Sequence, residues 1–385
     1  MFKKYALLLS TAITACLMAG SADAATARKS TFGKLPDGRE VTAVTLSNGK
    51  GVSATVIAYG AGLQSLIMPD RDGKAADVAL GYDNLQGYLD KRQFMGSTVG
   101  RFANRIAAGR FTLDGQTYQT TINDGKNALH GGTVGFDTVL WDVQSVKEGD
   151  TASVTLRYVS RDGDQGYPGT MTVDATYSLS ETNELTIDYR AVTDKATIVN
   201  ITNHAYWNLM GEGAVEGAMG HVLTIPAETY LPTDAGSIPT GEFRSVAGTV
   251  FDFRTPQPIG ARVRNASDEQ IRFGRGYDHN WVITRTPPKD MQLMVRVVAP
   301  GSGRGFELWS NQPGLQFYSG NFMDATTHGK AKKIYRMGDA IVLEPQNFPD
   351  APNQKGFPSA RLEPGQTYRN VMTYRLLTNL PADAK

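Results

Sequence analysis

The stretch MTVDATYSLSETNELTIDYR, residues 171–190, decides the fold class. Its apolar residues fall on every second position, from Met171 to Leu179 and, after a polar turn, from Leu185 to Tyr189. Strict alternation over such a length is typical of β-strands with one face in the core and one in water. The stretch therefore predicts two antiparallel strands joined by a short turn.

The same pattern extends from Glu40 onward, with turn residues at short intervals. Apolar runs flank Asn48-Gly49 and Asp114-Gly115, dipeptides that favour tight hairpins. Further strands are expected around residues 154–158, at 293–297 and 306–308, and on both sides of Pro364-Gly365. Only residues 83–92 favour a helix, of one or two turns. We therefore expect an all-β protein with a large, single-domain antiparallel β-sandwich.

Residues 1–24 have the features of an export signal. Lys3 and Lys4 precede an apolar run, and Ala22-Asp23-Ala24 places small residues where signal peptidase requires them. We expect residues 25–385 to form the mature domain, periplasmic or secreted. The apolar run is too short for the roughly 20 residues of a transmembrane span. Because residues 13–16 resemble a lipoprotein signal, a lipid anchor on Cys16 is the alternative.

Cysteine content and charge limit the possible partners. Cys16 is the only cysteine, so the mature chain would have no disulfide and would need a large core. Removing residues 1–24 takes two lysines and one aspartate from 39 basic and 38 acidic side chains, which leaves no net charge. A neutral surface disfavours nucleic acid and anionic membranes as partners.

Several common catalytic arrangements are absent from the sequence. It has no glycine-rich phosphate loop before a helix, no G-x-S-x-G elbow and no HExxH pair, and the expected mature chain has no cysteine nucleophile. Imidazole and carboxylate groups remain as candidate acids and bases. A zinc site assembled from His130, His204 and a carboxylate is a further possibility, because ligands can come from distant strands.

The candidate groups stand where strand patterns break. VNITNHAYWNL, residues 199–209, interrupts an alternating run with His204, and Glu344 stands between an apolar strand and the loop that begins at Pro345. Each candidate alone has a structural explanation, such as a strand-end carboxylate or a turn residue. Together they include planar polar groups and aromatic rings, which suit the hydroxyls and apolar faces of a sugar.

Seven segments resemble those of the aldose 1-epimerases, or galactose mutarotases, in the order in which that family has them. The segments are GRFANRIAAGRF (100–111), NALHGGTVGFD (127–137), GYPG (166–169), ITNHAYWNL (201–209), GYDHNW (276–281), QPGLQFYSGNF (312–322) and LEPQNFPD (343–350). The resemblance covers nearly the whole expected mature chain. It implies a β-sandwich of the galactose-mutarotase type and agrees with the strand pattern.

The resemblance also implies an activity and a site. A member of the family would interconvert the α and β anomers of free aldohexoses such as glucose and galactose by opening and closing the ring. Glu344 would be the general base and His204 the general acid, with no metal and no cofactor. The residues expected to bind the sugar are Asn104, Arg105, His130, Tyr206, Asp278 and Gln316. Since Arg105 is the only cation among them, we expect unphosphorylated sugars, acted on by a monomer or homodimer.

Two alternatives come from other functional classes. A non-catalytic carbohydrate-binding module would use Asp278, Arg105 and the aromatic residues but would not need Glu344 and His204 together. Another sugar-active sandwich enzyme, a glycosidase or a hexose-phosphate epimerase, is the second alternative. A glycosidase would use two carboxylates, for which Asp278 and Glu344 are candidates.

Overall fold

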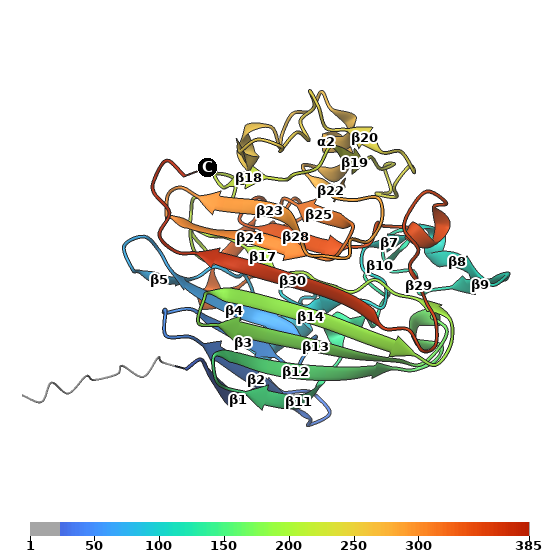
Figure 1. Cartoon of the computed structure of the whole chain (residues 1–385), viewed down its shortest axis with the longest axis horizontal. Helices are drawn as coiled ribbons and strands as arrows, with labels where there is room; N and C mark the ends of the chain where they lie inside the picture. The colour runs from blue at the N-terminus through green and yellow to red at the C-terminus, as the bar shows by residue number, and fades with distance from the viewer. Residues whose placement is uncertain (1–23, 385) are drawn as a thin grey trace, which may run out of the picture.

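The protein is described by a computed structural model that covers residues 24–384. The expected export signal, apart from Ala24, therefore lies outside the described residues, as does Cys16. Among residues 24–384 no helix is both long and apolar enough to span a membrane. The chain is built from antiparallel strands, as predicted (Figure 1).

A nine-stranded sheet is the central sheet of the fold, and it contains the stretch at residues 171–190. In spatial order its strands are β11 (Asp142–Lys147), β12 (Thr151–Ser160), β13 (Met171–Ser180), β14 (Glu184–Thr193), β30 (Tyr368–Leu377), β24 (Arg304–Ser310), β23 (Gln292–Ala299), β18 (Val222–Thr224) and β21 (Gln257–Pro258). Buried and half-buried residues alternate without interruption along β13. The period-two prediction is thereby confirmed.

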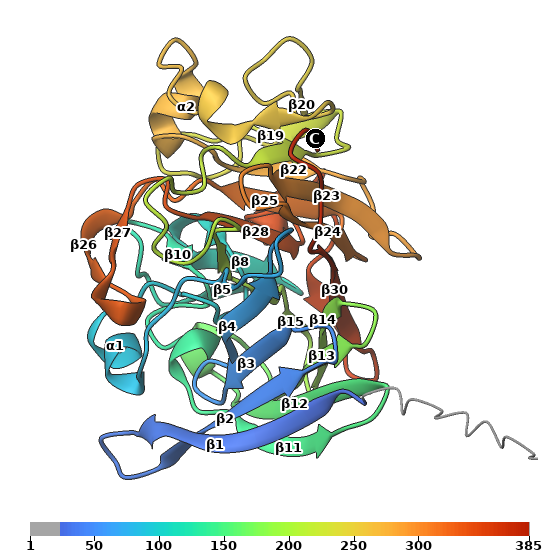
Figure 2. The same cartoon turned by 90° about the vertical axis from the view of Figure 1, so that its left-hand side faces the viewer.

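Two further sheets cover one face of this sheet. The first contains β1 (Thr26–Lys34), β2 (Glu40–Ser47), β3 (Ser53–Ile57), β4 (Gly62–Pro69) and β5 (Ala75–Asp77). Figure 2 shows its strands stacked on β11–β14, and β1, β2 and β3 contact β12 and β13. The second contains β17 (Tyr206–Trp207), β28 (Ile341–Gln346), β25 (Gly314–Tyr318), β22 (Asp278–Val282), β19 (Thr229–Leu231) and β20 (Arg244–Ser245).

The six-stranded sheet packs on the other half of the nine-stranded one. Trp207 of β17 lies against Phe306 of β24 and Tyr374 of β30, with ring centroids 5.6 and 5.2 Å apart. Because successive side chains of a strand point to opposite faces, Tyr206 faces away from this core. One face of the sheet is therefore a core face, and the other is free to build a site.

Short elements complete the fold. Two-stranded ladders pair β6 (Thr98–Val99) with β16 (Thr202–Asn203), β7 (Arg105–Ile106) with β10 (Ala128–Leu129), β8 (Arg110–Leu113) with β9 (Gln116–Gln119), β15 (Thr197–Ile198) with β29 (Arg361–Leu362), and β26 (Asp324–His328) with β27 (Ile334–Arg336). The α-helices are α1 (Leu85–Asp90) and α2 (Glu269–Gly274). Single 3₁₀ turns occur at Ala107–Gly109, Phe136–Thr138, Asp164–Gly166, Ile259–Ala261, Lys330–Lys332 and Ala351–Asn353.

The expected helix is α1, which Asn84 caps by accepting from the N–H of Gly87. Helix α2 was not expected, because six residues are too few to show an amphipathic stripe; Asp268 caps it. Asp114 and Gly115 form the predicted two-residue hairpin, with φ of 53° and 77°. The Asn48-Gly49 connection is wider, because the Asn48 side chain accepts from the N–H groups of both Lys50 and Val52. These side-chain bonds add to a backbone bond from Asn48 N to Val52 O that closes the loop.

Candidate active site

The floor of the site is the free face of the six-stranded sheet. The register places Glu344 of β28 opposite Gln316 of β25. Two residues further along β25, Tyr318 lies opposite Asp278 of β22. Tyr206 pairs with Val342 at the same level as Tyr318. Residues opposite each other on antiparallel strands project to the same side. Strand register thus gathers groups that lie far apart in the sequence.

The stretch at residues 199–209 changes partners at His204. Before it, β16 pairs with β6, and after it, β17 pairs with β28. The backbone of His204 bridges the change, because its N–H donates to Ser97 O at 2.9 Å and its carbonyl accepts from Gly96 N at 3.0 Å. This change of partner explains why the alternating pattern breaks there and fixes the imidazole beside Tyr206.

Two other polar residues of this stretch are structural. The Asn203 amide donates to Gly96 O at 2.7 Å and to the Tyr177 hydroxyl at 3.1 Å. The Asn208 amide donates to Asp339 O at 2.9 Å. Both side chains are fully buried and hold loops in place. Of the polar groups in the stretch, His204 and Tyr206 are the ones that reach the cavity described below.

The loops around β7 and β10 supply the opposite wall. The Asn104 N–H donates to His130 Nδ1 at 3.2 Å, and the His130 N–H donates to Asn104 O at 3.0 Å. Because Nδ1 accepts a hydrogen bond, the proton of the neutral ring is on Nε2, which is then a donor. Both residues have left-handed backbone conformations, with φ of 62° and 49°. Such conformations are uncommon for residues other than glycine and occur often at functional sites.

These elements enclose a cavity of about 260 Å³. Its lining comprises Gln93, Phe94, Asn104, Arg105, Asp124, Leu129, His130, His204, Tyr206, Asp278, Tyr318, Phe322 and Glu344. All predicted site residues except Gln316 are in this set. Gln316 projects from the same face of the sheet into a small adjoining hollow, where its amide donates to Asp278 Oδ1 at 2.8 Å. It supports a lining carboxylate rather than lining this cavity.

Burial dominates the electrostatics of the cavity. It raises the pKa of Glu344 well above its usual value, the Asp278 carboxylate adds to that rise, and Arg105 opposes it. Burial lowers the pKa of His204 to about 4 and that of His130 well below its usual value. Both effects favour uncharged groups, because a poorly hydrated site penalises charge. Glu344 Oε1 and His204 Nδ1 are buried without a hydrogen-bond partner among the described residues.

The aldose 1-epimerase family model matches residues 42–375. The chain belongs to this family. It is 42% identical over 343 residues to a galactose mutarotase of Sus scrofa, covering 89% of this chain and 96% of the relative. It is 36% identical to the aldose 1-epimerase of Escherichia coli strain K12, covering 89% and 97%. The predicted family is therefore confirmed, and the protein is an isomerase of the aldose 1-epimerase type.

Solved structures of aldose epimerases have the same fold. The galactose 1-epimerase of Lactobacillus acidophilus matches with a TM-score of 0.80 and 30% identity, covering 91% of this chain and 98% of that one. An aldose epimerase homologue from C. elegans matches with a TM-score of 0.77 and 32% identity, covering 86% and 97%. The predicted sandwich is confirmed. Family membership also argues against the non-catalytic binding module.

Sequence reasoning missed six lining residues: Gln93, Phe94, Asp124, Leu129, Tyr318 and Phe322. Tyr318 and Phe322 lie inside a segment that carries the family resemblance, so an aromatic pair there could have been noticed. Their rings stack with centroids 6.0 Å apart. Phe94 lies outside the seven segments. It belongs to the site because its ring packs against that of His130, with the ring centroids 4.8 Å apart. Its left-handed backbone, with φ of 58°, is not visible in the sequence.

Among residues 24–384, His130, His204 and Glu344 form the group of side chains that could hold a metal ion. One ligand atom from each lies within 4.8 Å of the others. Donors on a tetrahedral zinc are only about 3.3 Å apart, given zinc–ligand bonds of roughly 2.0–2.2 Å. A zinc-bound histidine also donates its second ring nitrogen to an acceptor, whereas His130 Nδ1 accepts from Asn104. The hydrogen bonding therefore suits a sugar hydroxyl better than zinc.

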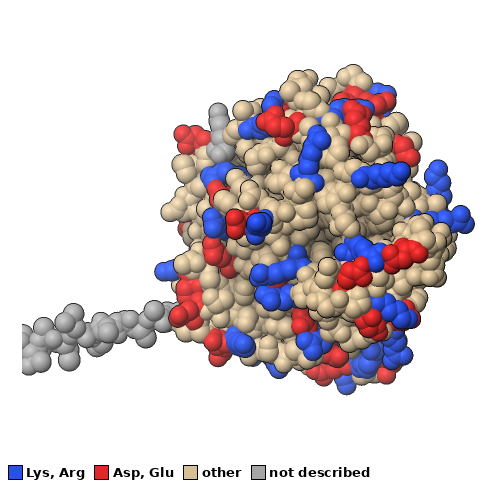
Figure 3. Space-filling view, turned by 45° about the vertical axis from the view of Figure 1, so that its right-hand side comes forward, with Lys and Arg blue, Asp and Glu red and all other residues tan. Residues whose placement is uncertain are grey.

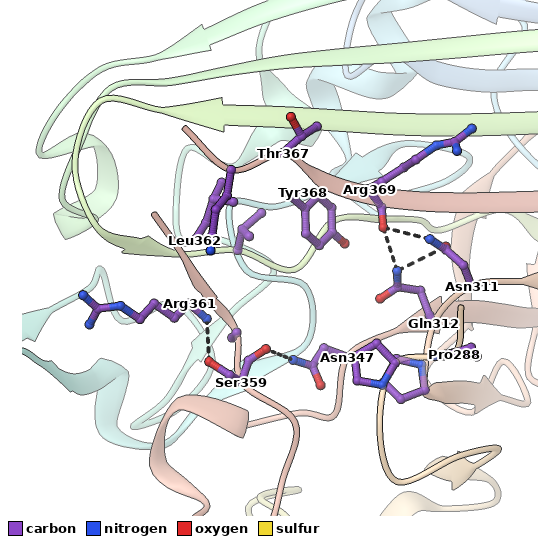
Figure 4. A pocket seen from close by; sticks show the side chains of 15 residues that line it. Pro288, Asn311, Gln312, Asn347, Ser359, Arg361, Leu362, Thr367, Tyr368 and Arg369 are labelled. Atoms are coloured by element: carbon purple, nitrogen blue, oxygen red, sulfur yellow. Dashed lines mark hydrogen bonds between the residues drawn. The ribbon is translucent and has the colours of Figure 1, made fainter. Parts of the chain in front are cut away.

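A second pocket, of about 510 Å³, lies beside β29 and β30 (Figure 4). Its polar groups are largely occupied. The amides of Asn311 and Gln312 donate to Arg369 O, and that of Asn347 donates to Pro358 O. The guanidinium of Arg369 donates to the Asp188 carboxylate. Neither His204 nor Glu344 reaches this pocket, whose described lining holds no histidine or carboxylate.

Proposed function

We propose that the protein interconverts the α and β anomers of free aldohexoses, with glucose and galactose as representative substrates. Its family membership supports the reaction type. A cavity of about 260 Å³, lined by imidazole, carboxylate, amide and aromatic groups, has the size and chemistry to hold one sugar ring. The reaction needs one base, one acid and no cofactor.

In the proposed mechanism Glu344 removes the proton of the C1 hydroxyl while His204 protonates the ring oxygen. The ring opens, rotation about C1–C2 presents the other carbonyl face, and the reversed transfers close the ring. At neutral pH burial favours the uncharged pair, so a proton must pass from Glu344 to His204 before ring opening. The ligand atoms of the two groups lie within 4.8 Å of each other, a gap that one sugar hydroxyl can bridge.

The surrounding residues would hold the sugar and the developing charge. His130, as an Nε2 donor, and Arg105 would stabilise negative charge on oxygen during ring opening. Asp278, held by Gln316, would accept from sugar hydroxyls. Tyr206 and Phe94 would cover an apolar ring face. The observation that carries the proposal is the convergence of Glu344 and His204 in one sugar-sized cavity.

Polarimetry tests the activity directly. Freshly dissolved α-D-glucose or α-D-galactose should reach its usual equilibrium rotation faster with catalytic amounts of protein, and chromatography should find no new product. Release of a smaller sugar from a glycoside would instead indicate a hydrolase. A strong preference for glucose 6-phosphate over glucose would favour the hexose-phosphate epimerase alternative.

The proposed mechanism also requires no metal ion. Dialysis against a chelator should leave the rate unchanged, because proton transfer and hydrogen bonding account for the roles of His130 and His204. Loss of activity that zinc restores would replace this mechanism with a metal-assisted one.

We further propose that the enzyme is exported and acts in the periplasm or outside the cell. The proposal rests on Lys3, Lys4, the apolar run and the small residues before Ala25. On the face shown in Figure 3, acidic and basic side chains are interspersed, consistent with a neutral, water-exposed surface. Mass spectrometry of the mature N-terminus should find Ala25; an acylated Cys16 would show the lipid-anchored form instead.

A further inference from the structure

The one cation among the predicted sugar-binding residues is already paired. Arg105 Nε donates to Asp124 Oδ2 at 2.8 Å, and both residues line the cavity. The Arg105 side chain is 13% exposed and that of Asp124 is 37% exposed. Asp124 is therefore the more solvent-exposed member of the pair, and its carboxylate is accessible at the cavity that both residues line.

The Asp124 carboxylate is not needed to build its own turn. The turn closes through the backbone, with Asp124 N donating to Asn127 O and Asn127 N donating to Asp124 O. Gly125 provides the left-handed residue, with φ of 59°. The preceding Asn123 secures the loop, since its side chain bonds both the N–H and the carbonyl of Leu129. Among the described residues the hydrogen bond of the Asp124 carboxylate is to Arg105 alone.

Two other guanidinium groups lie against aromatic rings of the cavity lining: Arg275, 5.3 Å from the centroid of the Phe322 ring, has no ion pair among the described residues, whereas Arg92 is neutralised. Arg92 lies 4.7 Å from the centroid of the Phe94 ring and makes two bonds to the Asp137 carboxylate, at 2.7 and 2.8 Å. The cavity itself holds three carboxyl groups, of Asp124, Asp278 and Glu344, against the single charge of Arg105. A ligand anion would meet at least one carboxylate near its path, and the one cation of the lining is already paired.

We propose that Asp124 is a specificity-determining residue that makes the cavity select uncharged aldoses over anionic ones, such as uronic acids and sugar phosphates. The inference rests on the proposed function. Asp124 acts in two ways: it occupies Arg105 Nε, and its own charge repels a carboxylate or phosphate on the sugar. An uncharged sugar is not repelled by the carboxylate, and it can bond the guanidinium N–H groups that Asp124 leaves free.

The test compares D-galactose with D-galacturonate, which differ at C6 but share the reacting carbon. The ratio of kcat/KM for galacturonate to kcat/KM for galactose should rise about 10-fold in Asp124→Asn, as expected for removal of one like charge near the ligand. Asp124→Glu keeps the charge and should keep the wild-type ratio. Asp174→Asn removes a carboxylate that pairs with Arg157 on the solvent-facing side of β12 and β13, and it should also leave the ratio unchanged.

A measurement on the wild-type enzyme tests the proposal even if the variants do not fold. Raising the salt concentration from about 0.02 to about 0.5 M should increase the wild-type ratio, because salt screens repulsion between accessible charges. An unchanged ratio in folded Asp124→Asn, or a wild-type ratio insensitive to salt, would overturn the proposal. If the wild type accelerates neither sugar, the proposed function fails instead. Calorimetric binding of the two sugars to wild type and Asp124→Asn then decides the selectivity on its own.

Discussion

The cavity at the six-stranded sheet and the pocket beside β29 and β30 differ in a way that volume does not reveal. The pocket is the larger, about 510 against about 260 Å³. Its amides and guanidinium groups bond neighbouring carbonyls and carboxylates. In the cavity, buried polar atoms of Glu344 and His204 have no partner among the described residues, and the pKa values of both groups are displaced by burial.

This difference shows how a site can be recognised. A fold usually satisfies its buried polar groups, because an unsatisfied one costs about 1–3 kcal/mol. Where several such groups converge on one space, a role in binding or catalysis is the simplest explanation of the cost. The larger pocket has no comparable cluster. Substitutions in the cavity should therefore reduce catalysis strongly, and substitutions at the pocket should not.

The largest effect is expected from Glu344→Gln. The variant keeps shape and hydrogen-bonding reach but removes the proton acceptor, so kcat should fall by about 10²-fold or more. Glu363→Gln is the matched control beside the second pocket, where Glu363 bonds Arg361, and it should leave kcat unchanged. Polarimetry with α-D-galactose measures both. Near-normal turnover of Glu344→Gln would mean that another group is the base.

His204→Asn should lower kcat by about 10²-fold, since the amide cannot cycle a proton at neutral pH. The double variant with Glu344→Gln should lose far less than the product of the two single losses, because both groups serve one relay. His328→Asn, on the exposed side of β26, is the control. Strictly multiplicative losses would argue that the two residues act independently.

A plot of the rate against pH should be bell-shaped. Its two limbs should follow the pKa values of His204 and Glu344, both of which burial shifts. Catalysis needs one proton on the Glu344–His204 pair. Below about pH 4 both groups are protonated, and above the raised pKa of Glu344 both are deprotonated, so kcat/KM should fall about tenfold per pH unit on each side. The profile should be measured after subtracting the uncatalysed rate. If His204→Asn altered the alkaline limb and not the acid one, this assignment of the limbs would be wrong.

Asp278→Asn and Arg105→Ala should mainly weaken sugar binding. Each removes a charged hydrogen-bonding group, typically worth about 1.5–3 kcal/mol, so KM should rise by about 10-fold or more while kcat changes less. Saturation curves for galactose separate the two constants. An equal fall in kcat with unchanged KM would indicate a role in the transition state.

The smallest effect is expected from Thr367→Ala at the second pocket. Thr367 is exposed, and its hydroxyl has no hydrogen bond within the described chain. Activity should be unchanged and stability should stay within about 0.5 kcal/mol of wild type. Calorimetric unfolding and polarimetry check both. A clear loss of activity would show that the two regions are coupled after all.

The sequence predicts the fold well because period-two alternation follows directly from strand geometry. Residues 171–190 show the pattern on both sides of one polar turn, and the sheet that contains them is the largest among the described residues. Short or capped elements were harder to predict. Helix α2 depends on one capping side chain, and the loop after β2 depends on hydrogen bonds of Asn48 that no dipeptide preference describes.

The site was predicted in its residue types but not in its arrangement. Glu344, Asp278 and His204 were identified by broken patterns and by family resemblance, and they line one cavity. The bond from Gln316 to Asp278 depends on the register of β22 and β25, which a single sequence does not show. Asp124 was missed because an aspartate beside a glycine is normally explained by the turn alone. The catalytic roles stay predictions until the variants are measured.

The change of partner at His204 also bears on how the chain acquires activity. The stretch at residues 199–209 joins β6, formed from residues 98–99, to β28, formed from residues 341–346. Elsewhere in the fold, the Ala107 N–H donates to the Asp350 carboxylate, 243 residues away in sequence. Contacts of such separation require large loops to close and form late in folding. Catalysis is thus a stringent reporter of complete folding: a nascent chain lacking its last fifty residues would have its imidazole and no base to work with it.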